Sequence, residues 1–237
     1  MRPADLARVR LVLTRSAHFN SLSPAVLERL AQMAEMRHAR NAERFEAPPS
    51  TDERLWIVVD GAVRLSARPK ETGREYVHAV LGPGSFFGLA SAVGHGPFTI
   101  DARAFGETSV AVIDGARLRD ALNLHPRFWR YVSGLLSKRL RLALGVMEDN
   151  RLRPLNERVA RRLLGHAMSC ALADNAQPVL RMTQADLARM VDVARSRLNP
   201  VLKKMQAEGL LKAGYRGITL LDVPRLRALA GSGVVPF

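Results

Sequence analysis

Three patterns of hydrophobic and polar positions follow one another along the chain. Ser23 and Pro24 are favoured at a helix start, and apolar residues at helical spacing then predict an amphipathic helix over residues 24–36. Between residues 43 and 113 the pattern changes to short β-rich runs separated by Gly-containing turns. These runs are LWIVV at 55–59, AVRLSA at 62–67, YVHAVL at 76–81 and TSVAVI at 108–113. Short strands with Gly at the corners predict an antiparallel barrel or jelly roll.

The helical period returns after Pro126 and continues to Leu152. One apolar seam along this helix consists of Leu136, Leu140, Leu144 and Met147, and a second apolar face lies beside it. A helix with two apolar faces is expected to pack on its own roll with one face and on a partner with the other. We therefore predict a homodimer through the 126–152 helix. Pro154 ends the helix, so residues 152–156 are a natural hinge.

The C-terminal part predicts a helix–turn–helix after a helix over residues 155–172 and a polar loop over 173–178. Thr183 is a favoured N-cap, and Asp186 three residues later imitates a capping box. Asp192 falls where the tight turn needs a residue that tolerates positive φ. The next helix, over residues 194–208, is the expected recognition helix.

Gly209 ends the recognition helix, and a two-stranded wing follows up to Leu221. The fold class is therefore α+β with three parts. Residues 1–125 form a β-roll sensor domain, residues 126–153 a dimerisation helix and hinge, and residues 154–237 a winged helix–turn–helix domain.

The net charge of +14 is distributed unevenly. Residues 1–125 carry 16 Lys and Arg against 14 Asp and Glu, whereas residues 126–237 carry 20 against 8. This asymmetry favours a nucleic-acid partner for the second half over a membrane surface. The one cysteine, Cys170, excludes an intramolecular disulfide, a cysteine-ligated iron–sulfur cluster and a thiolate zinc site. No apolar run is long enough to cross a bilayer, so we expect a cytoplasmic protein with no membrane partner.

The helix–turn–helix also carries the chemistry of DNA recognition. Arginines at the start of its second helix suit guanine O6 and N7 in the major groove, and the first helix starts with short polar side chains that suit a phosphate. Pro200 interrupts this pattern because it removes a backbone bond to Ser196. Either the recognition helix is kinked and continuous, or Asn199 caps a shorter helix that begins at Pro200.

Nearly the whole chain resembles the family of bacterial regulators that includes the cyclic-AMP receptor protein and the fumarate–nitrate reduction regulator. The segments that carry the resemblance are LWIVVDGAVRL, LGPGSFFGLAS, HPRFWRYVSGLLSKRLRLAL, ERVARRLLGHA and MTQADLARMVDVARSRLNPVLKKM. The resemblance implies a dimeric transcription factor, not an enzyme. Its roll would sense a signal, its wings would bind a pseudo-palindromic site in double-stranded promoter DNA, and RNA polymerase would be a further partner.

Carried over by position, Arg195 and Ser196 stand where base contacts are made, and four residues stand at or near backbone contacts. The full set of DNA-binding candidates is Thr183, Gln184, Arg195, Ser196, Arg197, Asn199 and Lys203.

The chain departs from the cyclic-nucleotide-binding members of this family. They hold the cyclic phosphate with a Gly-Glu pair and an Arg-Ser pair. At these positions, and at those of the adenine-binding hydroxyls, this sequence has Gly88, Leu89, Phe98, Thr99, Ala143 and Leu144. A phosphate buried beside Leu89 and Phe98 lacks its charge partner, at a cost of several kcal/mol. We therefore do not expect cyclic AMP in the usual manner, and the candidate pocket either takes another effector, whose identity is unknown, or is vestigial.

Three alternatives remain open at this stage. A heme-responsive member would ligate iron through His78, His95 or His125. A metal-dependent cupin-type enzyme would need two or three His with a carboxylate at one end of the roll, and no His-x-His occurs. A cyclic-nucleotide-binding module that acts on a protein partner would need the missing phosphate residues.

Overall fold

The computed structural model describes residues 2–46, 53–69, 71–125, 127–169, 177–214 and 217–233, and these divide into two compact units. The first unit comprises residues 2–65 and 81–139, and the second comprises residues 66–80, 140–169 and 177–233. Pro126, Cys170, most of the polar loop predicted over 173–178 and the wing tip at Tyr215 lie outside the described residues.

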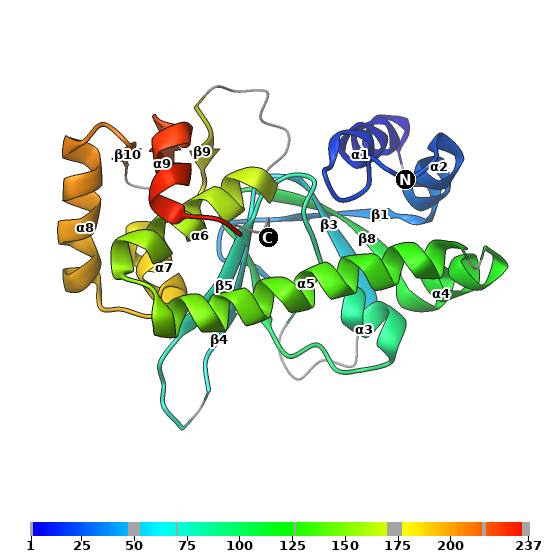
Figure 1. The fold of residues 1–237 in the computed structure, drawn as a ribbon. Helices are drawn as coiled ribbons and strands as arrows, with labels where there is room; N and C mark the ends of the chain where they lie inside the picture. The colour runs from blue at the N-terminus through cyan, green and yellow to red at the C-terminus, as the bar shows by residue number, and fades with distance from the viewer. Residues whose placement is uncertain are drawn as a thin grey trace. The chain divides into compact units, whose positions relative to one another are not determined.

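The first unit contains a β-roll with helices on both sides of it in the sequence (Figure 1). Its elements are α1 (Pro3–Arg15), α2 (Pro24–Met33), β1 (Glu35–Ala39), β2 (Arg44–Glu46), β3 (Arg54–Asp60), β6 (Phe86–Phe87), α3 (Leu89–Gly94), β7 (Asp101–Ala104), β8 (Thr108–Asp114) and α4 (Gly115–Leu124). Strands β4 (Val63–Ala67) and β5 (Tyr76–Leu81) start or end here, and the hairpin between them belongs to the second unit. Helix α5 (Arg127–Leu152) runs through both units.

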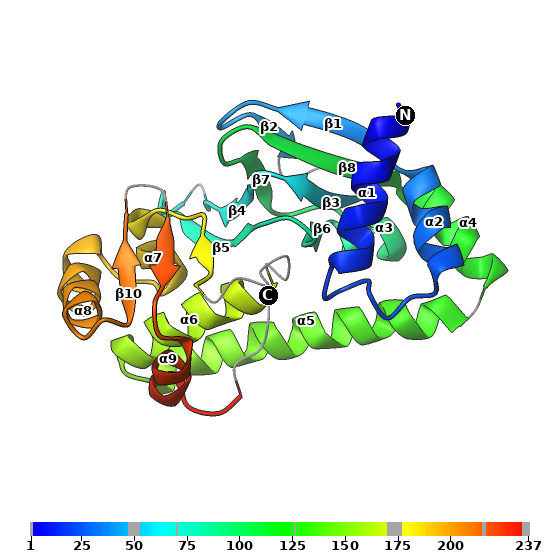
Figure 2. The same ribbon diagram turned by 90° about the horizontal axis from the view of Figure 1, so that it is seen from above.

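Two four-stranded sheets make up the roll, as the alternation of short apolar runs and glycine turns predicted. One has the order β1-β8-β3-β6 and the other the order β2-β7-β4-β5 (Figure 2). Gly61 turns the chain between β3 and β4 with φ +78°, and an added Cβ would lie 2.3 Å from the Glu107 carbonyl oxygen. Only glycine fits this corner.

The helix predicted over 24–36 is wrong at its C-terminal end. Helix α2 ends at Met33, and Glu35 already pairs with Val112 as the first residue of β1. Backbone pairing with β8 satisfies the hydrogen bonds that another helical turn would have made locally. Pairing with β8 therefore outweighs the helical spacing of the apolar residues in this segment.

One apolar core joins α1 and α2 to a face of the roll. Val9 and Leu13 of α1 pack with Leu27 of α2, and Ile57 and Ile113 come from the central strands. Each of these side chains is buried. The start of α5 closes the cluster with Val132.

The second unit is a winged helix–turn–helix with an additional helix at each end of the motif. Its elements are α6 (Leu155–Ser169), β9 (Val179–Leu180), α7 (Gln184–Met190), α8 (Arg195–Ala207), β10 (Leu211–Ala213), β11 (Ile218–Leu220) and α9 (Val223–Ala230). The predicted two-stranded wing is in fact three-stranded, with the order β10-β11-β9, because Leu180 pairs with Ile218. Among the described residues, no helix is both long enough and apolar enough to span a bilayer.

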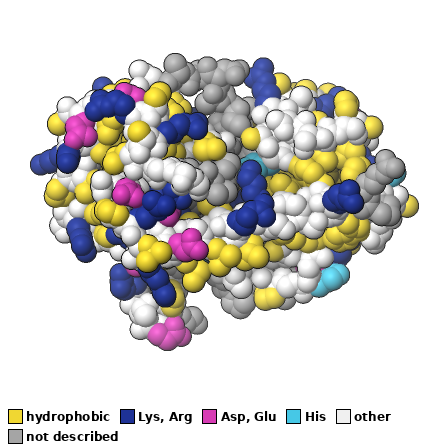
Figure 3. Space-filling view, in the orientation of Figure 1, with side chains coloured by type: hydrophobic (Ala, Val, Ile, Leu, Met, Phe, Trp, Pro, Cys, Tyr) yellow, Lys and Arg dark blue, Asp and Glu magenta, His cyan; other side chains and the backbone are white. Residues whose placement is uncertain are grey.

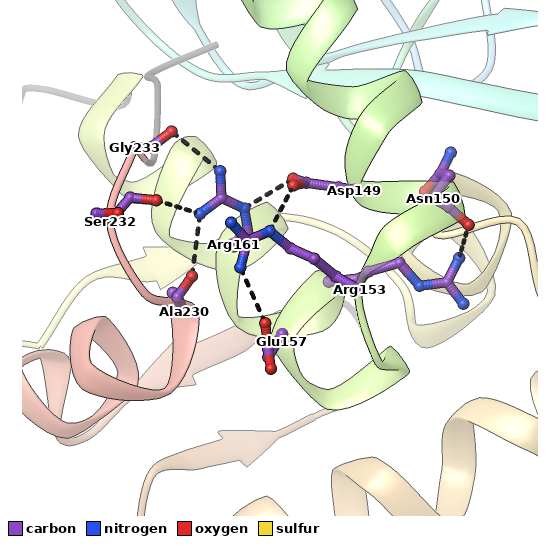
Figure 4. A network of polar contacts seen from close by, with 9 residues as sticks. Asp149, Asn150, Arg153, Glu157, Arg161, Ala230, Ser232 and Gly233 are labelled. Carbon is purple, nitrogen blue, oxygen red and sulfur yellow. Dashed lines mark hydrogen bonds and ion pairs between the residues drawn. The ribbon is translucent and has the colours of Figure 1, made fainter.

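A polar network joins α5, α6 and α9 inside this unit, and Figure 4 shows it at close range. Asp149 accepts from Arg153 at 3.0 Å and from Arg161 at 2.8 Å. The Arg161 guanidinium also donates to the carbonyl oxygens of Ala230 and Ser232, at 3.0 and 2.7 Å. Charge-assisted bonds of this kind are roughly twice as strong as neutral ones, so the junction after α5 is held in a defined geometry.

Candidate nucleic-acid interface

The first helix of the motif begins with the predicted capping box. The Thr183 hydroxyl accepts the Asp186 amide at 3.0 Å and donates to the Asp186 carboxylate at 2.6 Å. That carboxylate in turn accepts the Thr183 amide at 3.1 Å. Leu187 and Met190 are fully buried beneath the helix, which fixes the rotation of α7 and leaves Gln184 partly exposed at its start.

The turn between the two helices uses the predicted residue. Asp192 has φ +49°, and Val193 donates its amide to the Ala188 carbonyl at 3.0 Å. Asp tolerates this left-handed conformation better than most residues. The turn therefore sets the direction in which α8 leaves α7.

Arginines from other parts of the second unit hold this turn, and the sequence did not indicate them. Arg158 of α6 donates to the Val191 carbonyl oxygen at 3.2 Å. Arg74, in the hairpin between β4 and β5, pairs with Asp192 at 3.1 Å, and Glu75 beside it pairs with Arg189 at 3.3 Å. These partners lie far apart in the sequence, so no local spacing could have revealed them.

The predicted base-contacting residues lie together at the N-terminus of α8. Arg195, Ser196 and Arg197 are exposed, whereas Leu198 is fully buried against the motif core. In the described part of the chain, neither arginine is paired with a carboxylate, and Ala194 supplies no side-chain cap to the helix. Positive charge from two guanidinium groups thus adds to the positive end of the helix dipole.

The remaining DNA-binding candidates lie farther along α8. Lys203 is exposed, and Asn199 is partly buried with an Oδ1 that has no hydrogen-bond partner among the described residues. Pro200 lies inside the helix, which continues from Arg195 to Ala207. The continuous alternative is therefore the observed one, and Asn199 does not start a shorter helix.

The candidate effector-pocket residues of the first unit are divided between the two faces of β6. Phe98 packs on Phe87 at 6.0 Å between ring centroids, and Phe87 stacks on Trp56 at 5.7 Å. Leu89 instead joins the core cluster that contains Phe86. Successive strand residues point to opposite faces, so the phenylalanine pair separates Leu89 from Phe98. Gly88 has φ +80°, and Thr99 is exposed.

The Phe98 side chain makes an aromatic contact with Phe87 and offers no positive charge. It is 6% exposed and belongs to a stack of rings, so a phosphate at this position would meet apolar surface. The residues present do not fit the cyclic phosphate in the family's usual manner. The other two candidates, Ala143 and Leu144, are exposed residues of the second unit.

The three histidines considered as heme ligands lie at different places on the chain. His78 of β5 is half-buried against Tyr76, and burial together with the nearby Arg162 lowers its pKa. His95 bonds to Glu53 at 3.0 Å, and His125 is exposed at the end of α4. Within the described ranges, no group of three or more His, Cys, Asp or Glu residues could hold a metal ion.

The predicted dimer seam is solvent-exposed over its C-terminal part. Leu140, Leu144 and Met147 are 61%, 50% and 57% exposed, and Leu136, in the first unit, is partly buried. Figure 3 shows hydrophobic side chains gathered over this half of α5. Three large apolar side chains on one helix face are a typical feature of a protein–protein contact.

Comparison with known proteins identifies two families along the chain. A cyclic nucleotide-binding domain matches residues 48–125, and a Crp-like helix-turn-helix domain matches residues 157–229. The order of the two matches agrees with the order of the roll and the winged motif.

Several characterised proteins are similar over most of their length. The chain is 24% identical to the CRP-like cAMP-activated global transcriptional regulator of Mycobacterium tuberculosis, over 91% of this chain and 96% of the relative. It is 29% identical to the transcriptional regulator SdrP of Thermus thermophilus, over 79% and 89%. Among solved structures, FixK2 from Bradyrhizobium japonicum matches with a TM-score of 0.73 and 26% identity, over 84% of this chain and 98% of that one.

Proposed function

Because the chain belongs to the CRP/FNR family of bacterial transcription regulators, we propose that it binds promoter DNA as a homodimer and responds to an effector other than cyclic AMP. The N-terminus of α8 is the observation that supports DNA binding most directly. Two exposed arginines stand there at a helix end without a side-chain cap, and neither forms an ion pair with the described residues. Such a helix end suits the major groove and its phosphates.

The roles of the individual residues follow from their positions. Arg195 and Ser196 contact base edges, because they occupy the first turn of the recognition helix. Arg197 and Lys203 lie at or near the phosphate backbone, as do Thr183 and Gln184 at the start of α7. Asn199, whose Oδ1 has no hydrogen-bond partner among the described residues, lies between Arg197 and Lys203 on α8.

The homodimer forms through α5, and the exposed leucine and methionine face supports it. A two-fold axis along this helix would present two recognition helices to a pseudo-palindromic site. The protein acts in the cytoplasm as a regulator and not as an enzyme, and RNA polymerase is its further partner at the promoter.

The test of DNA binding is a polarisation assay with the chain's own upstream DNA across a salt series. Affinity should fall as salt rises, because each neutralised phosphate releases counterions. Arg195→Ala should relax the sequence preference at one position by about 1–3 kcal/mol, whereas Lys203→Ala should weaken all sequences alike and reduce the salt slope by about 1. Uniform loss in both variants would contradict the assignment of base readout. Absence of binding at any salt would contradict the function itself.

A separate titration tests the effector specificity. Isothermal calorimetry with cyclic AMP and cyclic GMP should show no tight binding, because Phe98 and Leu89 offer no charge partner to the phosphate. Micromolar affinity for either nucleotide would instead support the cyclic-nucleotide-responsive alternative. A Soret band after reconstitution with heme would support the heme-responsive one.

A further inference from the structure

An apolar cavity of about 50 Å³ lies inside the first unit, between α2, α4 and the first turns of α5. Figures 1 and 2 both show these three segments next to one another. Among the lining side chains are Leu30 of α2, Leu122 of α4 and Leu135 of α5, together with Phe86 and Leu89 from the roll. This volume is roughly a third of that of an engineered apolar cavity that binds benzene, so it has room only for the last few carbons of an alkyl chain.

The cavity opens beside a cation. Arg29 and Ala121 line both the cavity and a wider surface groove between α2 and α4. Glu28, the neighbouring carboxylate, accepts hydrogen bonds from Arg10 at 2.5 Å and Gln32 at 2.6 Å. No carboxylate pairs with Arg29 in the part of the chain that the structure describes. The exposed Arg29 side chain therefore stands at the mouth of the cavity, with its aliphatic part on the cavity side and its guanidinium toward the outer groove.

We propose that this cavity binds the end of the alkyl chain of a small amphipathic carboxylate, whose remaining carbons pass through the mouth and whose carboxylate binds Arg29 in the outer groove. The apolar lining favours a dry compartment and a hydrocarbon occupant, since water finds few polar partners there. The unpaired guanidinium selects the charge of the head group, because Arg binds a carboxylate through two parallel hydrogen bonds. The site is separate from the aromatic stack of Trp56, Phe87 and Phe98.

The position of the cavity gives such a ligand a route to regulation. Tyr131, Val132 and Leu135 of α5 form part of its wall, and α5 continues to the exposed seam at Leu140. A ligand that packs against the first turns of α5 favours one placement of this helix over others. This regulatory consequence rests on the proposed function, whereas the binding site itself does not.

The binding test uses tryptophan fluorescence of the full chain. Trp129 stands on α5 between the lining residues Phe128 and Tyr131, and the other tryptophan, Trp56, is buried in the roll. Hexanoate and the uncharged hexan-1-ol serve as probes. Both should give a saturable change that disappears in Trp129→Phe, with hexanoate bound about tenfold more tightly. No saturable change with either probe, or equal affinity for the two, would overturn the proposal.

Two variants and one matched control locate the site. Arg29→Gln should weaken hexanoate about tenfold and leave hexan-1-ol unchanged. Arg117→Gln removes a cation that lines only the outer groove, so it should leave both affinities unchanged. Ala121→Leu fills the cavity and should weaken both probes at least tenfold, with circular dichroism as the check of folding. An equal effect of Arg29→Gln and Arg117→Gln would overturn the assignment of the head group.

DNA binding supplies the second readout. Hexanoate should change the affinity of the wild-type chain for its upstream DNA at least threefold and leave Arg29→Gln unaffected. Saturable hexanoate binding without this change supports the site and overturns the regulatory link. Saturable hexanoate binding by a chain that binds no DNA would overturn the proposed function and leave the cavity site standing.

Discussion

Pro200 lies in the sixth position of α8, and the helix continues through it. Proline has no amide to donate to the Ser196 carbonyl, and its ring crowds that oxygen. Buried Leu198, Leu202 and Met205 face the motif core on either side of the proline. Their burial keeps the segment helical despite the free-energy cost of the proline. This explains why the recognition helix is continuous.

Replacing this proline should therefore stabilise the protein. Pro200→Ala restores one backbone hydrogen bond and removes the ring, and we expect the free energy of unfolding to rise by about 2 kcal/mol. Urea denaturation followed by circular dichroism measures this change. The exposed variant Arg197→Ala is the control and should shift stability by less than about 0.5 kcal/mol. A destabilised Pro200→Ala protein would show that the proline has a packing role.

Two buried histidines make stability depend on pH. Burial, with the nearby Arg162, lowers the pKa of His166 to about 3, and burial, with the nearby Arg139, lowers the pKa of His18 to about 4. The unfolded chain binds these protons near pH 6.5, whereas the folded chain does not bind them until lower pH. The unfolded state is therefore favoured as pH falls below about 6.5, by about 1.4 kcal/mol per pH unit for each histidine.

His166→Gln should remove one of these contributions. Between pH 6.5 and 5, wild-type stability should fall by about 2 kcal/mol more than that of the variant. Urea denaturation at the two pH values measures the difference. His125→Gln changes an exposed histidine and should keep the wild-type pH dependence. An unchanged slope in His166→Gln would mean that the folded and unfolded chains bind the His166 proton equally well.

At the scale of helices and strands, the local sequence pattern predicts most boundaries to within a few residues. It fails where a segment pairs with a strand that is distant in the sequence. The recognition helix is predicted over 194–208 and spans 195–207, because Gly209, with φ +70°, ends it within the segment itself. Helix α1 was not predicted. Its buried Val9, Val12 and Leu13 have helical spacing, but the charged residues in and around this group conceal the short apolar face.

Helix α5 carries a prediction about assembly. At 3.6 residues per turn, Leu136, Leu140, Leu144 and Met147 fall within an arc of about 80°. The double variant Leu140→Glu, Leu144→Glu places like charges on this face and should convert a dimer to a monomer at micromolar concentration. Multi-angle light scattering after size exclusion measures the mass.

A matched control stands on the same helix. Leu152 is 80% exposed, yet it points roughly 120° away from the centre of the seam. Leu152→Glu should therefore keep the wild-type mass. If the double variant has the mass of the wild-type protein, the dimer interface on α5 is refuted.

At the scale of the whole molecule, charge predicted the kind of partner but not the contact surface. The excess of Lys and Arg in residues 126–237 indicated a polyanion. The structure divides these cations into two groups. Arg153, Arg161 and Arg189 are paired with carboxylates of the second unit, whereas the cations at the start of α8 pair with no carboxylate that the structure describes. Net charge counts both groups equally, so only the contacts separate structural arginines from those available to DNA.

The sequence by itself determined the elements whose signals are local: the glycine corners of the roll, the Thr183–Asp186 capping box, the positive-φ turn at Asp192 and the helical period of α5. Each depends on residues within one or two turns of one another. Only the tertiary structure decided that β1 replaces the end of a helix, that β9 joins the wing and that Phe87 separates Leu89 from Phe98. It also decided that an apolar cavity opens beside Arg29. These features depend on strands and helices that are distant in the chain, and packing against distant partners outweighs the small free-energy preferences that local sequence expresses.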